Sequence, residues 1–261
     1  MLSKKYKLYD HTVNVGYIRA KELKNEDVYL VFLHEALGSI GQWKNFPKLL
    51  CDELGVNGFI IERQGHGASD PFTEKRTSRY LHEAAIDELP QVMTHIIPGG
   101  KKIVLVGHSD GGTIALLHAA QFPKHILGVV TMAAHVIVEK ETLEGIEPAV
   151  EAYESGKLDG LKRFHGEKTD ALFYAWADTW RSPEFETWNI VEDIKGFPRP
   201  ALIIQGKQDQ YGTEKQVGLI CSQLPLSTPV LLDNCKHHPH LEKTEELVAL
   251  IGSWKASVNL F

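Results

Sequence analysis

Positions 107–112 of the chain read GHSDGG, a glycine-rich stretch with one serine at its centre. Gly107, Ser109 and Gly111 form the pattern Gly-x-Ser-x-Gly. Such a pattern can hold a serine on a sharp strand-to-helix turn, where the small neighbours make room for strained backbone and the hydroxyl is exposed as a nucleophile. A glycine-rich turn with an incidental serine is the alternative, because so short a pattern also occurs by chance.

The residues around this motif favour the nucleophile turn. KKIVLVG before it is a short apolar run that predicts a buried strand, and GGTIALLHAAQF after it predicts a helix. The hydroxyl of Ser109 would then lie at the carboxyl end of the sheet, where open α/β sheets bind their ligands. A serine is a poor nucleophile alone, so a base and a third group that holds the base must accompany it.

Candidates for these partners occur late in the chain, each just after a predicted strand. Asp209 follows the run ALIIQG, and His237 lies in the loop after PVLLD. The order serine, acid, histidine is the one that a strand–turn–helix nucleophile uses in an α/β sheet. Asp233 is a second possible acid at the end of its strand, and His238 and His240 are neighbouring histidines.

The elements that would position these residues alternate along the chain. Two extended stretches, YKLYD and TVNVGYIRA, predict antiparallel strands, and continuously apolar runs from VYLVFL to PVLLD predict strands buried on both faces. Stretches with helical periodicity separate these runs, and Thr213 with Gln216 has the spacing of a capping box at one helix start. We therefore expect an α/β fold with a mostly parallel central sheet of about eight strands flanked by helices.

One interval, 135–199, breaks this alternation. A structureless loop of that length inside a compact domain is improbable, and two of its stretches, EKETLEGIEPAVEAYESG and ALFYAWADTW, have helical periodicity. We expect a helical cap at 135–199, inserted after the sixth strand, over a core formed by 1–134 and 200–261.

The chain resembles the α/β-hydrolase superfamily, and within it the small cap-bearing esterases and C–C hydrolases. The stretches that carry the resemblance span nearly the whole chain: LVFLHEALGSIGQW, IERQGHGASD, LVGHSDGG, IIQGKQDQYGT and CKHHPHLE. The resemblance implies that Ser109 is the nucleophile, His237 the base and Asp209 the residue that orients the base. These stretches are specific for the fold and the triad, and much less so for the substrate.

The choice of base depends on the loop after the last strand. The family's pattern there is G-H-x-P-H, and CKHHPH fits it for His237 with Lys236 in place of the glycine. This departure leaves His238 and His240 as alternatives.

The choice of nucleophile has an alternative as well. Dehalogenase and epoxide hydrolase relatives use an aspartate, which would be Asp110. The turn requires small residues two before and two after the nucleophile. Centred on Asp110 the first of these is His108, whereas centred on Ser109 both are glycines. Ser109 is therefore preferred.

The resemblance also implies an oxyanion hole. One donor would be the backbone N–H of Asp110, and the other the N–H of Ala36 in HEALG, where the family has H-G-x-x-G. Glu35 replaces a glycine of that pattern, and a carboxylate beside a site for negative charge is adverse. We expect its side chain to be turned away and paired with Arg63 or His34.

The substrate pocket is predicted from the residues near these loops and from the cap. The candidates are His34, Glu35, His108, Trp176 and Trp180. The aromatic residues of the insertion could line an apolar acyl pocket or pack the cap onto the core, and both interpretations stay open, since pockets are themselves mostly apolar.

The composition of the chain limits which binding partners and which cellular compartment we expect. Lys and Arg number 28 and Asp and Glu 34, a net charge of −6 without basic runs, which predicts binding to neither nucleic acid nor anionic membranes. The longest nearly apolar run has about thirteen residues, too few for a bilayer, and no signal peptide is recognisable. Three scattered cysteines fit a reducing compartment, so we expect a cytoplasmic protein. The expected oligomeric state is a monomer or a homodimer.

A metal site is a weaker interpretation of the tract that contains Cys235, His237, His238 and His240. So tight a spacing serves a closed tetrahedral site badly, and no distant cluster of partners is recognisable in the sequence. We therefore expect neither a metal nor a cofactor.

The expected function is hydrolysis of a small acyl substrate by a serine nucleophile, with a carboxylic ester as the first candidate. C–C bond hydrolysis of a dienoate-type ketone, thioester hydrolysis and acyl transfer would use the same residues. A receptor that binds a ligand without turnover is the alternative of another class, because a fold does not determine a function.

Overall fold

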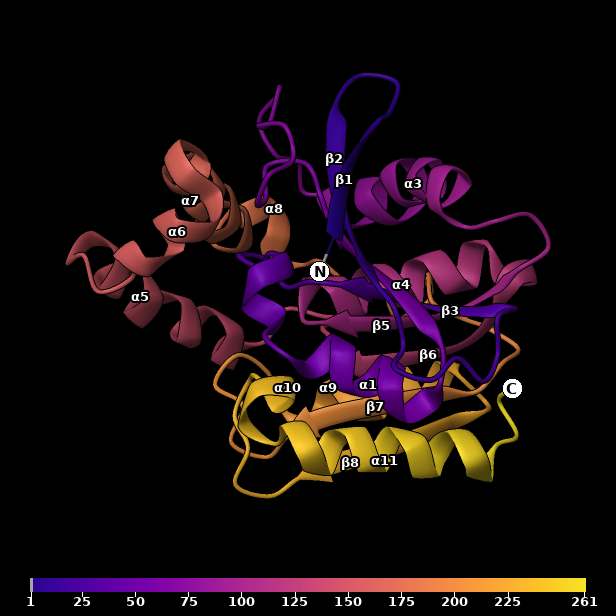
Figure 1. The fold of residues 1–261 in the computed structure, drawn as a ribbon. Helices are drawn as coiled ribbons and strands as arrows, with labels where there is room; N and C mark the ends of the chain where they lie inside the picture. Colours follow the sequence, from indigo (N-terminus) through magenta and orange to yellow (C-terminus); the bar gives the residue numbers. More distant parts are fainter. Residues whose placement is uncertain (1) are drawn as a thin grey trace.

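An eight-stranded sheet forms the centre of the computed structural model, which describes residues 2–261 (Figure 1). The strands lie in the order β1-β2-β4-β3-β5-β6-β7-β8. β2 pairs antiparallel with β1 and β4, and the other neighbours pair parallel. The predicted α/β fold with a mostly parallel sheet is thereby confirmed. The strands are β1 Leu2–Lys7, β2 Thr12–Ile18, β3 Val28–Leu33, β4 Asn57–Glu62, β5 Lys102–His108, β6 Ile126–Met132, β7 Ala201–Gly206 and β8 Ser227–Leu232.

Helices follow most of the strands. They are α1 Phe46–Leu54, α2 Tyr80–His82, α3 Leu89–Ile96, α4 Asp110–Gln121, α5 Lys140–Glu154, α6 Lys162–His165, α7 Thr169–Trp180, α8 Pro183–Glu186, α9 Glu214–Gln223, α10 Pro239–Glu242 and α11 Thr244–Ser257. A π-helical segment, Glu83–Glu88, joins α2 to α3, and short 3₁₀ segments span Ile40–Trp43, Pro123–His125, Asp159–Leu161 and Gly166–Lys168. Within residues 2–261, none of these helices has both the length and the apolar character that crossing a membrane requires.

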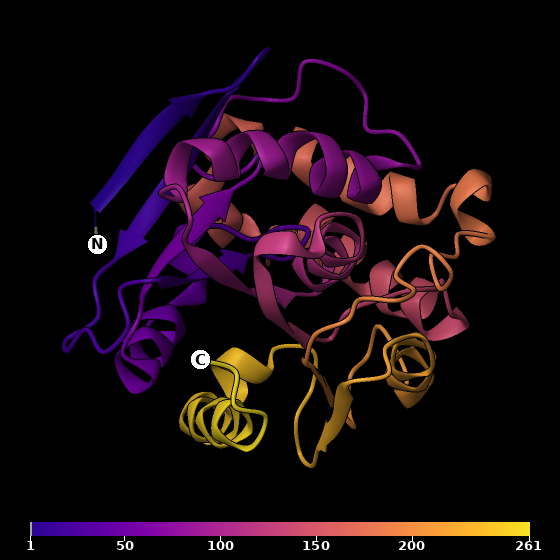
Figure 2. The ribbon, with the colours of Figure 1, turned by 90° about the vertical axis from the view of Figure 1, so that its right-hand side faces the viewer.

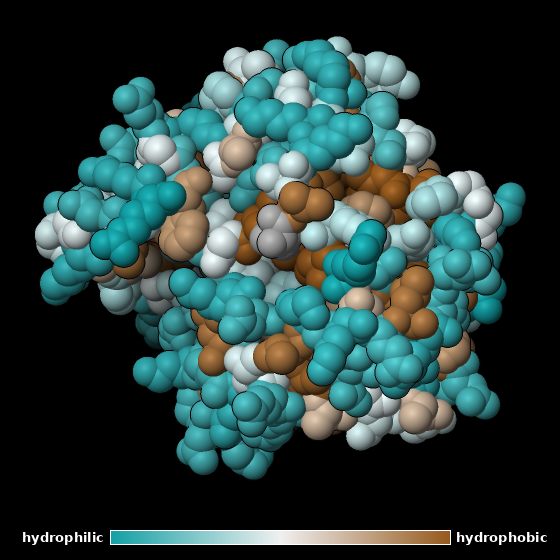
Figure 3. Space-filling view, viewed as in Figure 1, coloured by the Kyte–Doolittle hydropathy of each residue, from teal (hydrophilic) through white to brown (hydrophobic). Residues whose placement is uncertain are grey.

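The helices cover both faces of the sheet and create two hydrophobic cores. On one face α1 and α11 bury side chains such as Leu50 and Ile251 against the strands, and Figure 2 shows these two helices close together, with α11 in yellow. On the other face α3, α4 and α9 contribute side chains such as Val92 and Ile114. Burial on both faces explains why β3 to β7 read as continuous apolar runs. On the surface seen in Figure 3 hydrophilic side chains predominate, and apolar ones appear in small groups.

The interval 135–199 is helical, as its periodicity predicts. It contains α5, α6, α7 and α8, which lie together at one end of the molecule (Figure 1). Phe173 and Trp180 of α7 are buried. The exact division into a core of 1–134 and 200–261 and a cap of 135–199 stays a prediction.

The start of α9 differs from the expected capping box. Thr213 is the N-cap, and its hydroxyl accepts a hydrogen bond from the Lys215 N–H at 3.2 Å. The Gln216 side chain does not accept the Thr213 N–H, which donates to the Glu139 carboxylate at 3.0 Å instead. Its buried amide accepts from the Val136 N–H at 2.8 Å and donates to the Glu139 carboxylate at 2.7 Å. A buried amide must be satisfied, and the segment after β6 supplies its partners, which the local sequence pattern does not reveal.

Candidate active site

Ser109 lies at the turn between β5 and α4, in a backbone conformation that side chains rarely adopt. Its φ is 51° and its ψ −120°. The glycines on either side are required by close packing: a Cβ on Gly111 would lie 1.9 Å from the Leu33 carbonyl oxygen, and one on Gly107 would lie 2.2 Å from the Gly111 carbonyl oxygen. Strain of this kind persists only where the surrounding structure enforces it, and it collects at functional sites.

The Ser109 side chain belongs to a buried chain of hydrogen bonds. The hydroxyl lies 3.0 Å from His237 Nε2, and His237 Nδ1 lies 2.9 and 3.0 Å from the two carboxylate oxygens of Asp209. A carboxylate can only accept, so Nδ1 carries the proton and Nε2 offers a lone pair to the Ser109 hydroxyl. The arrangement can take a proton from Ser109 and hold the resulting imidazolium.

The buried Asp209 carboxylate is held in place by several hydrogen bonds and kept ionised by His237. Its side chain is fully buried and also accepts the Tyr211 N–H at 2.9 Å and the Gln205 side-chain amide at 3.3 Å. Burial alone would raise the pKa of Asp209, but the charge and hydrogen bond of His237 outweigh it and hold the pKa below its ordinary value. The carboxylate is therefore ionised at neutral pH.

Topology explains how three distant residues meet. Ser109 follows β5, Asp209 follows β7 and His237 follows β8. These strands are parallel members of the consecutive set β5-β6-β7-β8, so their carboxyl ends lie at one edge of the sheet.

The alternative residues from the sequence have other partners. His238 pairs with Glu35, and the buried ring of His240 packs on Trp43 with 4.8 Å between ring centroids. Asp233 is exposed at the end of β8. The Ser109 hydroxyl donates its hydrogen bond to His237, so the geometry favours His237 and Asp209 over these alternatives.

The two expected oxyanion-hole residues, Ala36 and Asp110, line the same cavity as Ser109. The Asp110 carboxylate is engaged elsewhere. It accepts the Tyr80 hydroxyl at 2.8 Å, and the Trp180 indole N–H donates to that hydroxyl at 2.8 Å. The Tyr80 hydroxyl thus holds the Asp110 carboxylate, and the role of the Asp110 backbone N–H stays a prediction. Sequence reasoning missed Tyr80, because nothing in its local pattern indicates a contact with α4.

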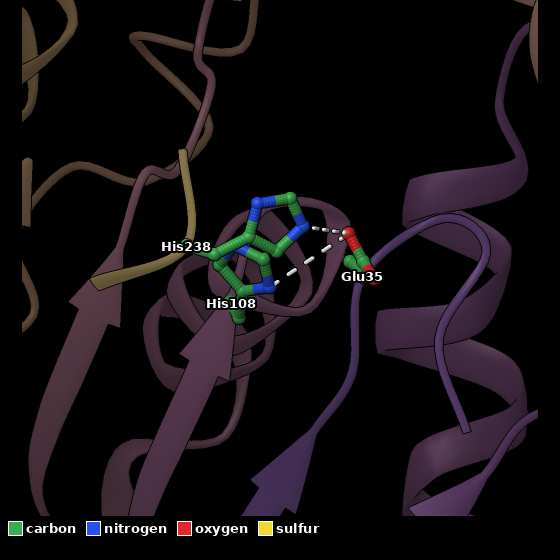
Figure 4. Close-up of side chains that lie close together, drawn as sticks. All are labelled: Glu35, His108 and His238. Carbon is green, nitrogen blue, oxygen red and sulfur yellow. Dashed lines mark hydrogen bonds and ion pairs between the residues drawn. The ribbon is translucent and has the colours of Figure 1, made fainter. Parts of the chain in front are cut away.

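Glu35 has a different partner from the two that we expected. Its carboxylate oxygen Oε2 lies 3.3 Å from His238 Nε2 and 4.0 Å from His108 Nδ1 (Figure 4). Arg63 is unavailable because its guanidinium donates to the backbone carbonyls of His34, at 2.6 Å, and Glu35, at 3.0 Å. The pairing with Arg63 or His34 was therefore wrong, since Arg63 holds the loop backbone and leaves the side chain free to face the cavity.

The pairing with His238 determines the charge of Glu35. Burial alone would raise the pKa of Glu35, but the hydrogen bond and charge of His238 lower it to about 2. Burial disfavours the charged form of His238, yet the same pairing raises its pKa above the ordinary value. The two side chains thus form an ion pair on the wall of the cavity.

The cavity above Ser109 has a volume of about 250 Å³ and is mostly apolar. Trp176 and Trp180 line it as predicted, as does Glu35, whereas His34 and His108 are buried and are not among its lining residues. Sequence reasoning missed the remaining apolar wall, although the helical period of α5 was the signal that could have revealed part of it. That wall consists of Leu37, Ile146, Ala149, Leu158 and Leu161.

Comparison with known proteins identifies the family. Residues 30–250 match the Alpha/beta hydrolase family, so the chain belongs to it. Relatives include a proline iminopeptidase of Saccharolobus solfataricus, 22% identical over 90% of this chain and 87% of that protein. Another is 2-hydroxy-6-oxononadienedioate/2-hydroxy-6-oxononatrienedioate hydrolase 2 of Pseudomonas putida, 24% identical over 85% of both chains. The names of these relatives support a hydrolase.

Solved structures agree with the fold. The enol-lactonase from Burkholderia xenovorans LB400 superposes with a TM-score of 0.76 at 11% identity, covering 97% of this chain and 100% of that one. A membrane phospholipase A described as a bacterial virulence factor gives a TM-score of 0.76 at 19% identity, covering 99% of this chain and 86% of that one. At such low identities the likeness extends to the fold alone.

Proposed function

We propose that the protein is a serine hydrolase that cleaves a small acyl substrate, with a carboxylic ester as the first candidate, through a covalent acyl-enzyme. The observation that carries this proposal is the unbroken hydrogen-bond chain from Asp209 through His237 to Ser109, buried at the end of a cavity. A nucleophile, its base and the group that orients the base are the three parts that serine hydrolysis needs.

In the proposed mechanism Ser109 Oγ attacks the substrate carbonyl while His237 Nε2 takes the hydroxyl proton. Asp209 holds the Nδ1 proton and so fixes the tautomer. The N–H groups of Ala36 and Asp110 would stabilise the oxyanion, each contributing roughly 2.7–4 kcal/mol to the transition state. His237 returns its proton to the leaving group and then activates a water that releases the acid.

The cavity supports a small, neutral acyl group. Its volume of about 250 Å³ is slightly below the usual range of ligand pockets, roughly 300–1,000 Å³. Among its lining residues, all within 2–261, there is no Lys or Arg to bind a carboxylate, and the paired Glu35 is anionic. A dienoate ketone carries a carboxylate, so an uncharged ester fits this wall better. The helices of 135–199 would exclude water and select the acyl group.

The test compares wild type with Ser109→Ala on p-nitrophenyl esters of graded chain length, beside thioesters and a dienoate ketone. We expect turnover of short esters, a fall on the order of 10⁶ in kcat for Ser109→Ala, and fluorophosphonate labelling of wild type only. Ser222→Ala removes an exposed serine hydroxyl on α9 and is the matched control. Activity of Ser109→Ala near the wild-type rate would sink the assignment, and labelling without turnover of any acyl substrate would favour a receptor.

A further inference from the structure

A second cluster of side chains lies beside the proposed triad and has no part in the proposed mechanism. It consists of Glu35 from the loop after β3, His108 from the end of β5 and His238 from the loop after β8 (Figure 4). One potential ligand atom of each residue lies within 4.8 Å of the other two. These residues are far apart in the sequence, which is why the tract after β8 alone gave no sign of a complete site.

The spacing of these atoms suits a small divalent cation. Glu35 Oε2 lies 3.3 Å from His238 Nε2 and 4.0 Å from His108 Nδ1. Two ligand atoms bound at about 2.0–2.1 Å to a tetrahedral Zn²⁺ are about 3.4 Å apart. The Glu35–His238 separation already matches this spacing. The Glu35–His108 separation would have to shorten by about 0.6 Å, and the His108–His238 separation, which is within 4.8 Å, by at most about 1.4 Å.

The protonation of His108 supplies an independent indication. Its Nε2 lies 2.7 Å from the His237 carbonyl oxygen, which can only accept, so Nε2 carries the proton of the neutral ring. The lone pair of Nδ1 then faces the Glu35 carboxylate, and two acceptors stand 4.0 Å apart with no proton between them. A cation between them would remove this repulsion. A histidine that binds a metal commonly donates its other N–H to a carbonyl in this way, which fixes its tautomer.

The cluster is reachable from solvent on one side. The His108 side chain is 2% exposed, but Glu35 is 21% and His238 35% exposed. Glu35 and His238 also line the cavity above Ser109. An ion bound here would lie in the wall of the substrate site.

We propose that Glu35, His108 and His238 form a binding site for Zn²⁺, with water as the fourth ligand, and that the bound ion inhibits hydrolysis by occupying part of the cavity. Two imidazoles and a carboxylate favour Zn²⁺ over Mg²⁺ or Ca²⁺, which prefer oxygen ligands. On binding, His238 Nε2 gives up the proton that it shares with Glu35, and that proton passes to solvent. The binding step is independent of the proposed function, whereas the inhibition rests on it.

The binding experiment is titration of the metal-free full chain with ZnCl₂, followed by calorimetry, and with Co²⁺, followed by its visible absorption. We expect one tight site, weakened at least tenfold in Glu35→Gln and in His238→Asn. Ser109→Ala should bind Zn²⁺ like wild type, so the site can be assessed even if the serine mechanism is wrong. Each variant is first compared with wild type by thermal unfolding without metal.

The matched control is His82→Asn, because His82 Nε2 lies 3.1 Å from an Asp193 carboxylate oxygen in a histidine–carboxylate pair outside the three-residue cluster. This variant should bind Zn²⁺ with unchanged affinity. No tight binding to wild type, unchanged affinity in both Glu35→Gln and His238→Asn, or equal weakening in His82→Asn would each overturn the site.

The inhibition experiment measures ester hydrolysis against free Zn²⁺. We expect at least a tenfold loss of rate at saturation, recovery on addition of EDTA, and a tenfold higher Zn²⁺ requirement in Glu35→Gln. Tight binding with full activity would overturn the inhibitory part of the proposal.

Discussion

Two clusters at the same sheet edge are built from neighbouring residues but differ in how their hydrogen-bond donors and acceptors are matched. The proposed triad takes Ser109 and His237, and the second cluster takes the residues beside them, His108 and His238. Each cluster adds one carboxylate from another loop. In the triad, donors and acceptors alternate at 2.9 to 3.0 Å. In the second cluster a lone pair faces a carboxylate at 4.0 Å.

What distinguishes the chemistry of the two clusters is whether each lone pair has a proton to meet. Both contain imidazole and carboxylate, yet only the triad aligns a proton path toward a hydroxyl. The second cluster presents three potential ligand atoms that all lie within 4.8 Å of one another. The two proposals together thus place a proton-transfer site and a cation site side by side on neighbouring loops.

Among the substitutions that compare the two clusters, the largest effect is expected from exchanging their acids for amides. Asp209→Asn should lower kcat by about four orders of magnitude without unfolding the protein, because the amide favours the wrong tautomer of His237. Glu35→Gln should change kcat less than tenfold in metal-free buffer, since its carboxylate does not contact the triad imidazole. Steady-state ester kinetics measure both. Equal losses in the two variants would contradict the division of roles.

Much of this site could be predicted from the sequence because the signals are local. Each triad candidate follows an apolar run directly, and parallel strands must end at a common edge, so Ser109, Asp209 and His237 could be expected to converge. Gly107 and Gly111 likewise indicate a turn that only small residues permit. The mostly parallel sheet followed from the same alternation of runs.

The features of the site that could not be predicted depend on contacts between loops that are distant in the sequence. The partner of Glu35, His238, is 203 positions away in the sequence. Arg63 donates its hydrogen bonds to backbone carbonyls. No local sequence pattern reveals either contact. Gln216 kept the spacing of a capping box but is bonded to the segment that leaves β6. The convergence of His108 with Glu35 could not be read from the tract after β8.

An intermediate effect is expected at the turn that supplies both clusters. Gly111→Ala would place a Cβ 1.9 Å from the Leu33 carbonyl oxygen. Backbone must shift to relieve this contact, so we expect the free energy of unfolding to fall by about 3 kcal/mol or more. Because Ser109 and His108 are on this turn, ester hydrolysis and Zn²⁺ affinity should fall together. Loss of only one of them would show that the clusters are less coupled than their shared turn implies.

The matched control is Gly218→Ala on α9, where an added Cβ meets no atom within 4 Å. This substitution should leave activity and metal affinity unchanged and raise the free energy of unfolding by up to about 1 kcal/mol, because alanine restricts the unfolded chain more than glycine does. Urea unfolding at one pH measures both variants.

The smallest effect is expected at a third histidine–carboxylate cluster, which does not line the cavity above Ser109. It serves as a reference, because we expect this cluster to contribute to stability and not to activity. His11 Nδ1 lies 2.7 Å from Asp10 and Nε2 3.0 Å from Glu88. The hydrogen bond and charge of Glu88, and those of Asp10, raise the pKa of His11 above its ordinary value despite burial. Its contribution to stability is therefore complete below about pH 6.5, the pKa of the unfolded chain, and is lost as the pH rises through the raised pKa.

His11→Asn should lower the free energy of unfolding at pH 5.5 by at most about 1 kcal/mol, since the Asp10 partner is largely exposed. The difference from wild type should shrink by pH 8.5, and ester hydrolysis should not change. Urea unfolding at the two pH values measures the first effect, and initial rates measure the second. A difference that stays constant with pH would mean that His11 acts through packing alone, and a loss of activity would mean that this cluster is coupled to the cavity after all.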